Sequence, residues 1–234
     1  MFCFRRDPDA VLGAGVAFTS GALDLGQAQD AAARRAAHDR LAAELGVPIA
    51  VVTQVHGNAV VHATAEPGAS GLVDITGQEA DALVTTQPGL AVAVRVADCV
   101  PICIVAEDAS VVAAVHAGRN GLLRGVICRA VEVMRTHTGV GLRAWVGPHV
   151  CGACYEVPRA MAEDGWGRLG IDPTDTTWGT PSLDLGAATL AQLAAAGVRA
   201  EAVGRCTLHD PGLHSHRGGS TGRQVGVAWI APGR

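Results

Sequence analysis

Aromatic rings and an excess of positive charge are both lacking in this sequence of 234 residues. It has one Tyr and three Phe, and its 18 Lys and Arg are outnumbered by 22 Asp and Glu, which gives a formal net charge of -4. Proteins that bind nucleic acids use basic surfaces to neutralise phosphates and aromatic rings to stack on bases. The composition therefore argues against a nucleic acid as partner.

Long apolar runs are lacking as well. The N-terminal segment has two arginines but no hydrophobic stretch of signal-peptide length behind them, and the most apolar segment, residues 89–116, is interrupted by Arg95 and Asp98. We therefore expect neither export nor a membrane span, and predict a cytoplasmic protein. Seven cysteines is an odd number in a chain large enough to fold without disulfides, so we expect reduced thiols.

Nucleotide-binding signatures are absent, because no GxGxxG follows a predicted strand and no GxxxxGK[ST] occurs. Helical segments are instead mixed with β-branched apolar runs, and the hydrophobic share is 49%. This pattern predicts one α/β domain over residues 1–234, with a mixed β-sheet layered with helices in a cysteine-hydrolase-like α-β sandwich and not a Rossmann fold. We predict helices over residues 28–45, 122–138, 158–169 and 183–197, strands at 49–55, 80–86, 90–99, 143–147 and 224–230, and a surface loop at 67–78.

A β-hairpin is predicted over residues 99–118, with its tip near Glu107 and Asp108. A two-residue tip at these positions and a four-residue tip centred on them both place Cys99 opposite His116. Directly opposed residues have Cβ atoms about 5 Å apart and lie on the same face. The register therefore predicts that this thiol and this imidazole meet.

Three side chains at predicted strand ends could share a metal ion. His56 precedes Gly57, Cys99 follows Asp98, and His116 comes before a strand-to-helix turn. Two imidazoles and one thiolate fill three positions of a tetrahedral zinc site and leave the fourth open for water or substrate, which is the catalytic pattern. The alternative is three separate core residues, because buried Cys and single structural His are both common. Cys103 is about 13 Å along the strand from Cys99, too far to be the fourth ligand.

The CxxC of Cys151 and Cys154 has the spacing of half a zinc knuckle or of a redox pair, but no second CxxC exists. We therefore interpret these two cysteines as thiols without a metal or redox role. The alternative is that this turn forms part of a pocket wall, together with Pro148, His149, Tyr155 and Glu156.

Two segments have the character of anion sites. Arg217 and Arg223 lie in a Gly-rich stretch at 214–224, where the backbone can approach an anion and guanidinium groups suit phosphate oxygens. Arg119 and Asn120 begin the helix after His116, where free backbone N–H groups attract anions. A solvated loop without any ligand is the alternative for the Gly-rich stretch.

The motifs taken together resemble the laccase-domain family, which has a multicopper-oxidase-like name and is now viewed as one of zinc-dependent purine nucleoside phosphorylases. The resemblance extends from about residue 49 to the end, and QVHG, ADCVP and HAG in this order are its most specific part. The motifs are TQVHG (53–57), ADALVTTQPG (80–89), RVADCVPICI (95–104), AAVHAGRNGLLRGV (113–126), VGPHVCGACYEV (146–157), LDL (183–185), CTLHD (206–210) and STGRQ (220–224).

The resemblance implies a mixed sheet sandwiched by helices and a zinc ion held by His56, Cys99 and His116. It also implies phosphorolysis of adenosine, inosine and methylthioadenosine to the free base and ribose 1-phosphate, with adenosine deamination as a further activity. The expected partners are a purine nucleoside and phosphate, and the chain is expected to be a monomer or homodimer. We assign catalysis to the three ligands and Asp98, and substrate or phosphate binding to Arg217, Arg223, Arg119 and His149. Asp98, His149 and His209 are the candidates for the general acid or base.

The sequence departs from the family pattern at four places. Arg119 replaces the usual Trp after HAG, and the run SHRGGS keeps Arg217 but lacks the second arginine. The N-terminal loop is shortened around residues 18–26, and the Asn-Arg pair of the first helix is replaced by Ala37 and His38. These departures concern the substrate more than the metal.

Three other functions remain open. Copper-dependent phenol oxidation would need several HxH pairs, and His214 with His216 is the single such pair among nine histidines, although Cu²⁺ stays the alternative metal. A thiol hydrolase would use Cys99 as nucleophile and His116 as base. A zinc protein without catalytic activity is the third alternative.

Overall fold

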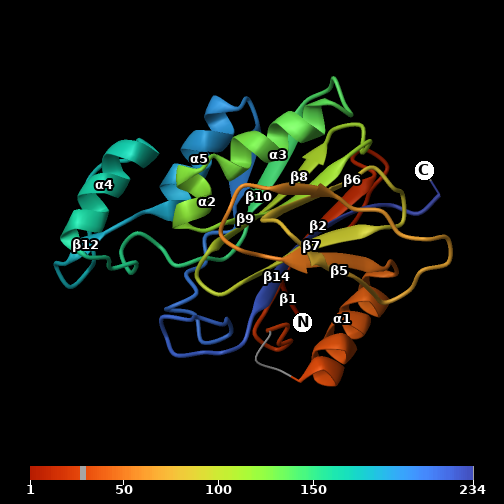
Figure 1. The fold of residues 1–234 in the computed structure, drawn as a ribbon, viewed down its shortest axis with the longest axis horizontal. Helices are drawn as coiled ribbons and strands as arrows, with labels where there is room; N and C mark the ends of the chain where they lie inside the picture. Colours follow the sequence, from red (N-terminus) through yellow and green to blue (C-terminus); the bar gives the residue numbers. More distant parts are fainter. Residues whose placement is uncertain (27–29, 234) are drawn as a thin grey trace.

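The structure is a computed structural model, and it describes residues 1–26 and 30–233. Two six-stranded sheets stack face to face, with helices on their outer sides (Figure 1). The first sheet has the order β1 (Phe2–Arg6), β2 (Ala14–Thr19), β14 (Gln224–Ile230), β7 (Ala91–Val96), β3 (Ile49–Thr53), β5 (Leu72–Glu79). The second has the order β13 (Arg199–Ala202), β10 (Leu142–Val146), β8 (Val100–Ala106), β9 (Val112–Ala117), β6 (Ala82–Thr85), β4 (Val60–His62).

Both sheets mix parallel and antiparallel pairs. In the first sheet β3 runs parallel to β5 and β7, whereas β14 is antiparallel to its two neighbours. In the second sheet β10 is parallel to β13 and antiparallel to β8. The predicted fold class, a mixed α/β sandwich that is not a Rossmann fold, is confirmed. The prediction of one sheet needs correction, because the strands divide between two.

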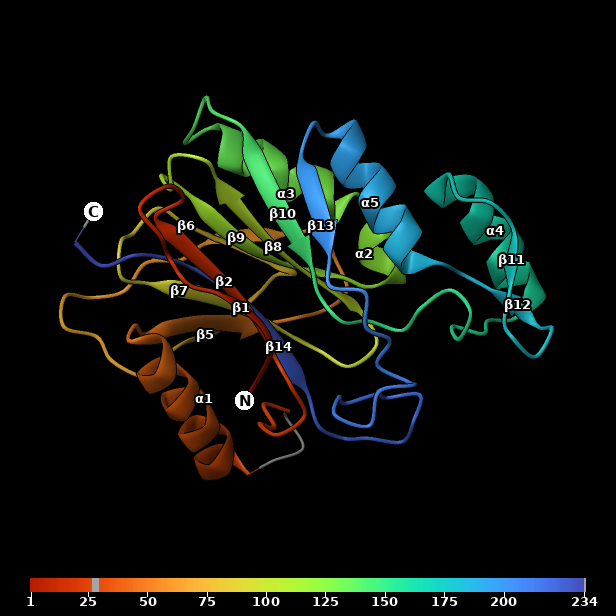
Figure 2. The ribbon, with the colours of Figure 1, turned by 180° about the vertical axis from the view of Figure 1, so that it is seen from behind.

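Buried apolar side chains form three layers of core. Between the sheets, β7 packs on β9 through residues such as Val92, Val94 and Ala114. Helix α1 (Ala31–Leu45) covers the first sheet with Leu41 and Leu45. Helices α3 (Val126–Arg135) and α5 (Leu185–Ala195) cover the second sheet on the opposite side of the molecule (Figures 1 and 2). Each sheet is therefore buried on both faces over most of its area, as the apolar strand sequences require.

Two shorter elements lie beside this sandwich. Helix α2 (Arg119–Leu123) follows β9 directly, and α4 (Arg159–Leu169) packs on the small hairpin of β11 (Thr174–Asp175) and β12 (Pro181–Ser182). Figure 2 shows α4 and this hairpin at one end of the molecule, away from α1. No helix within residues 1–26 and 30–233 has the length and hydrophobicity needed to cross a membrane.

The predicted helices are found with small changes. Helix α1 begins after Asp30, whose carboxylate accepts a hydrogen bond from the Ala33 N–H at 2.8 Å, and ends at Gly46 with φ of 72°. Residues 28 and 29 of the predicted helix lie outside the described residues. The single helix predicted over 122–138 is instead α2 and α3, because Gly125 adopts φ of 73° and interrupts the helix.

The surface loop predicted at 67–78 is wrong for its second half. Strand β5 runs from Leu72 to Glu79 and pairs in parallel with β3. It is an edge strand that is only partly buried, so its sequence lacks the continuous apolar run that identified the central strands. Strands β1 and β2 were likewise not predicted, and Phe18 of the supposedly shortened N-terminal loop lies in β2.

The hairpin exists, but its register differs from the prediction by two residues. His116 of β9 lies opposite Pro101 of β8, not opposite Cys99. The reason is the tip: Ala109 adopts φ of 57°, and the loop comprises the four residues 107–110, closed by a hydrogen bond from the Ala106 N–H to the Val111 carbonyl at 3.0 Å. A shift of two keeps every side chain on its predicted face. Cys99 therefore still lies on the His116 side of the sheet, one position before β8 begins.

Candidate metal site and pocket

His56 lies in a turn just after β3, with a backbone φ of 58°. Asp81 holds this turn. Its buried carboxylate accepts hydrogen bonds from the backbone N–H groups of Val55, His56 and Gly57 at 3.2, 3.0 and 2.6 Å. The unusual backbone conformation of His56 is thus stabilised by a side chain that directly precedes β6.

Cys99 lies between the end of β7 and the start of β8. The preceding Asp98 has φ of 85°, which turns the chain sharply here. The Cys99 Sγ lies 3.8 Å from Nε2 of His56. Although burial would raise the pKa of this thiol, interactions with His116 and His56 lower it to about 6. The site therefore favours the thiolate, which is the form that binds metals.

His116 is buried in β9, with 3% of its surface exposed. Its Nδ1 lies 2.7 Å from Oδ1 of Asp81, which leaves Nε2 for a ligand. Burial alone would lower the pKa of His116, but Asp81 and the Cys99 thiolate raise it to about 9. A carboxylate behind a ligating histidine is the usual way in which proteins fix the ring orientation at a metal.

Donor atoms of His56, Cys99 and His116 all lie within 4.8 Å of one another, as predicted, and we call these residues the three-ligand site. The two imidazole rings meet edge to face with centroids 4.8 Å apart. Gly118 leaves the room they need, since a Cβ atom there would be 2.9 Å from Cδ2 of His56 and 3.0 Å from Sγ of Cys99. Two imidazoles and one thiolate at these distances fit one metal ion with an open coordination position.

The three-ligand site faces a pocket of about 680 Å³. Arg217 and Arg223 line this pocket, as does Arg95, which sequence reasoning did not select. The Arg217 guanidinium stacks over the ring of Tyr155 at 4.7 Å, and the Arg223 guanidinium donates to the carbonyls of Thr221 and Gly222. The pocket therefore has a group of side chains that could hold a metal ion and several cationic groups on its walls.

Asp98 lines the pocket but has both carboxylate oxygens engaged. Oδ1 accepts from the Thr207 hydroxyl at 2.6 Å, and Oδ2 accepts from the Arg217 N–H at 2.7 Å. It thus joins the start of β8 to two C-terminal loops. This arrangement suits positioning better than proton transfer.

Three other predicted residues lie outside the residues that line the pocket. The Arg119 guanidinium forms an ion pair with Asp164 at 3.2 Å. His149 Nδ1 lies 2.8 Å from the Gly147 carbonyl, its ring packs against α5 at Gly186, and burial lowers its pKa. His209 lies beside Cys154 instead. The turn at 151–154 does adjoin the pocket, since Val150 and Tyr155 line it.

Asp81 is the main residue that sequence reasoning missed. It occurs in the motif ADALVTT, where a single carboxylate precedes an apolar strand. Such a residue is rarely buried without a specific partner, and Asp81 has no exposed surface. That pattern was the available signal, but it does not identify His116 as the partner.

Comparison with known proteins now identifies the family. Residues 13–231 match the family described as multi-copper polyphenol oxidoreductase laccase. The chain belongs to this family. It is 41% identical to a purine nucleoside phosphorylase of Corynebacterium glutamicum over 199 residues, which cover 82% of this chain and 79% of the relative. It is 43% identical to a purine nucleoside phosphorylase of Mycobacterium tuberculosis over 209 residues, 86% of this chain and 81% of the relative.

Solved structures with similar sequences share the fold. A protein of Neisseria meningitidis superposes with a TM-score of 0.81 at 25% identity, over 97% of this chain and 98% of the other. The YlmD protein of Geobacillus stearothermophilus has a TM-score of 0.78 at 26% identity, over 97% and 94% of the two chains.

Proposed function

We propose that this protein is a zinc-dependent purine nucleoside phosphorylase that acts on adenosine, inosine or methylthioadenosine and forms a free base and a sugar 1-phosphate. The observation that carries the proposal is that the three-ligand site and the side chains of Arg217 and Arg223 line one pocket. The names of the Corynebacterium and Mycobacterium relatives support the same activity.

In this proposal the arginines bind phosphate. Arg217 is held in place by its stacking on Tyr155 and by its backbone bond to Asp98, so its guanidinium is fixed before phosphate arrives. Arg223 uses one guanidinium nitrogen on backbone carbonyls and keeps its other donors for an anion. Arg95 adds positive charge to the lining of the pocket, and its Nη2 donates to the Val52 carbonyl at 3.0 Å.

The chemistry is a transfer of the sugar from base to phosphate. A phosphate oxygen forms a bond to C1′ of the ribose while the bond between C1′ and the purine nitrogen breaks. The purine leaves with the electron pair of that bond and takes up a proton from water. Positive charge develops on the sugar during this step, so phosphate held beneath it by fixed arginines stabilises the transition state.

Zinc, when bound, would act as a Lewis acid on a polar group of the substrate. The chain prepares for it in two ways. Asp81 fixes the His116 ring with Nε2 free, and the same carboxylate holds the turn that presents His56. Asp98 connects the Cys99 segment to Arg217 and so sets the distance between the metal-binding group and the phosphate-binding group.

The test is to quantify bound metal and then incubate the protein with adenosine, with and without phosphate. The expected products are adenine and ribose 1-phosphate, formed only with phosphate and lost after zinc is removed. Cys99→Ala should abolish metal binding at the three-ligand site and turnover together. Cys128→Ser, on the exposed side of α3, is the matched control and should leave both unchanged.

Other products would identify other functions. Inosine formed without phosphate would assign adenosine deamination to the site. Bound copper together with phenol oxidation would replace the proposal with the activity that the family description names. Tight zinc binding without any nucleoside turnover would refute the enzymatic proposal.

A thiol hydrolase is the second candidate, because the pKa of Cys99 is lowered to about 6 and His116 lies beside it. Such an enzyme would use the thiolate as nucleophile and would need no metal. Hydrolysis that survives chelators and is lost on alkylation of Cys99 would favour it over phosphorolysis.

A further inference from the structure

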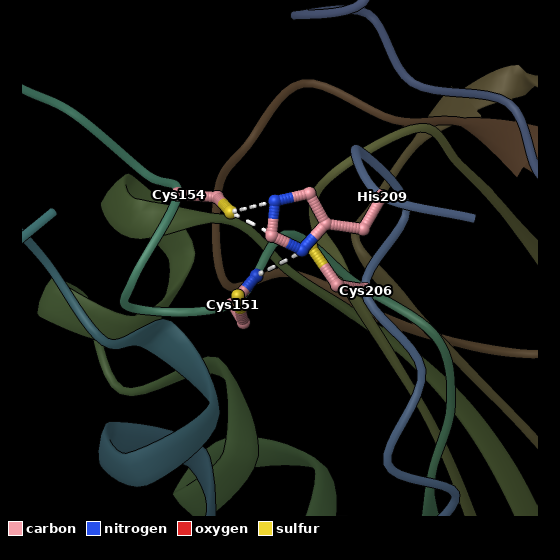
Figure 3. A group of neighbouring side chains, drawn as sticks. All are labelled: Cys151, Cys154, Cys206 and His209. Carbon is pink, nitrogen blue, oxygen red and sulfur yellow. Dashed lines mark hydrogen bonds between the residues drawn. The ribbon is translucent and has the colours of Figure 1, made fainter. Parts of the chain in front are cut away.

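A second group of metal-binding side chains lies outside the three-ligand site. Cys151 and Cys154 belong to the turn after β10, and Cys206 and His209 belong to the turn after β13. Figure 3 shows the four side chains pointing toward one another from these two segments. We call them the four-ligand cluster.

The two turns are built alike. Each offers two ligands three residues apart, as CxxC at 151–154 and as CxxH at 206–209. In each, a backbone N–H donates to the carbonyl of the leading cysteine: the N–H of Cys154 and Tyr155 to Cys151 at 2.9 and 3.0 Å, and the N–H of Asp210 to Cys206 at 3.0 Å. Paired ligands at this spacing on tight turns are typical of structural zinc sites. The CxxH at 206–209 thus supplies, at the same spacing, the second ligand pair that the sequence lacks as a CxxC.

The distances fit a single ion. All four donor atoms lie within 4.8 Å of one another, and Sγ of Cys154 is 3.2 Å from Nε2 of His209. Ligand atoms around a tetrahedral zinc, with bonds of about 2.3 Å to sulfur and about 2.0 Å to nitrogen, are separated by about 3.5 to 3.8 Å. Small side-chain rotations therefore suffice to close the four groups around zinc.

Backbone amides add support at Cys206. The Cys151 N–H donates to the Cys206 Sγ at 3.4 Å. Burial would raise the pKa of Cys206, but hydrogen bonds from backbone N–H groups of Cys151, Leu208 and His209 lower it. Amides directed at a sulfur stabilise negative charge there, as a metal-bound thiolate requires.

We infer that Cys151, Cys154, Cys206 and His209 form a second, structural zinc site with all four ligands supplied by the protein. Three thiolates and one imidazole select a soft ion such as zinc and leave no position for a substrate. The three-ligand site, by contrast, has an open position. The two sites thus have different tasks in one molecule.

The four-ligand cluster braces one wall of the pocket. Tyr155, on which Arg217 stacks, follows Cys154 directly. Thr207, which donates to Asp98, follows Cys206 directly. An ion that joins these two turns therefore fixes the positions of Tyr155 and Asp98, and through them that of Arg217.

Metal stoichiometry tests the inference without any assay of turnover. Wild-type protein purified under reducing conditions should contain about two zinc ions per chain, and a variant with His56→Ala and Cys99→Ala should retain about one. When His209→Ala or Cys206→Ser is added to that variant, the remaining zinc ion should be lost. His137→Ala and Cys128→Ser, which change exposed residues outside both groups, are the matched controls.

Cobalt provides a second, spectroscopic readout of the four-ligand cluster. Metal-free protein lacking the three-ligand site should bind Co²⁺ with an intense thiolate-to-cobalt charge-transfer band, which zinc displaces. Cys206→Ser should remove most of the band, because this variant loses the ion at the four-ligand cluster. A protein without this band, or one in which two of the cysteines at 151, 154 and 206 form a disulfide after purification under reducing conditions, would overturn the inference. These results are independent of whether the protein is a phosphorylase.

Discussion

Oδ1 of Asp81 lies 2.7 Å from Nδ1 of His116, and both side chains are buried. The same carboxylate accepts three backbone N–H groups of the turn that carries His56. Burial would raise the pKa of Asp81, but hydrogen bonds from His116 and the Gly57 N–H lower it, so the carboxylate stays charged. One residue thus positions two of the three proposed metal ligands.

Asp81→Asn should therefore weaken zinc binding at the three-ligand site. Asparagine keeps the size of the side chain but removes the charge that orients His116, and loss of such a partner reduces metal affinity by about 10-fold to 100-fold. Competition with a chromogenic chelator measures the change. Asp172→Asn, in an exposed loop, is the control and should bind zinc as the wild type does. Equal affinity in both variants would contradict the role of Asp81.

Arg217→Ala should raise the KM for phosphate by about tenfold or more, because a charge-assisted hydrogen bond contributes about 1.5 to 3 kcal/mol. Zinc content should stay the same, since the guanidinium contacts Tyr155 and none of the ligands. Steady-state kinetics at varied phosphate provide the measurement. Arg129→Ala, on the exposed side of α3, should leave the KM unchanged. If only the KM for adenosine rose and the KM for phosphate did not change, Arg217 would bind the nucleoside and not phosphate.

Alkylation of metal-free protein should modify Cys99 with an unusual pH dependence. Because the pKa of this thiol is about 6, the rate should rise about tenfold from pH 5 to pH 7 and then level off. As pH falls through 6 the thiolate is protonated and the reaction slows. An ordinary thiol would instead react faster up to about pH 8.5. Mass spectrometry after iodoacetamide treatment locates the label, and added zinc should protect Cys99. A rate that keeps rising above pH 8 would exclude the low pKa.

Gly118→Ala should disrupt the three-ligand site, because the new Cβ would lie 2.9 Å from His56 and 3.0 Å from Cys99. We expect zinc content to fall while the circular dichroism spectrum stays that of the wild type. Gly167→Ala in α4 is the matched substitution: its Cβ meets nothing within 4 Å, so it should keep zinc and stabilise the helix by about 0.5 to 1 kcal/mol. Full zinc occupancy in the Gly118→Ala variant would contradict this prediction, because it would show that His56 and Cys99 can make room for the added Cβ atom.

Much of this architecture could be predicted from local sequence. The C-terminal end of α1 follows from Gly46, and the central strands follow from their apolar runs. Edge strand β5 could not be predicted in this way, because a partly exposed strand has a weak apolar pattern. The hairpin register was missed because it depends on the backbone conformation of Ala109, a residue with no particular preference for positive φ.

The site was predicted to the extent that its residues have distinctive chemistry. His56, Cys99 and His116 were selected because imidazole and thiolate groups are rare and occur at strand ends. Asp81 and Arg95 were missed because their roles arise only when distant segments come together, whereas Tyr155 was predicted in a pocket wall and does line the pocket. Similarly, the CxxC at 151–154 had no partner in the sequence pattern until the fold brought Cys206 and His209 to it.

Strand β14, residues 224–230, lies in the middle of the first sheet, hydrogen-bonded to β2 on one side and β7 on the other. During synthesis this sheet has a gap at its centre until the ribosome has added those residues. Formation of the complete sheet must therefore wait until residues 224–230 have left the ribosome, and a nonsense mutation shortly before residue 224 would release a chain with two unpaired strand edges, prone to aggregate.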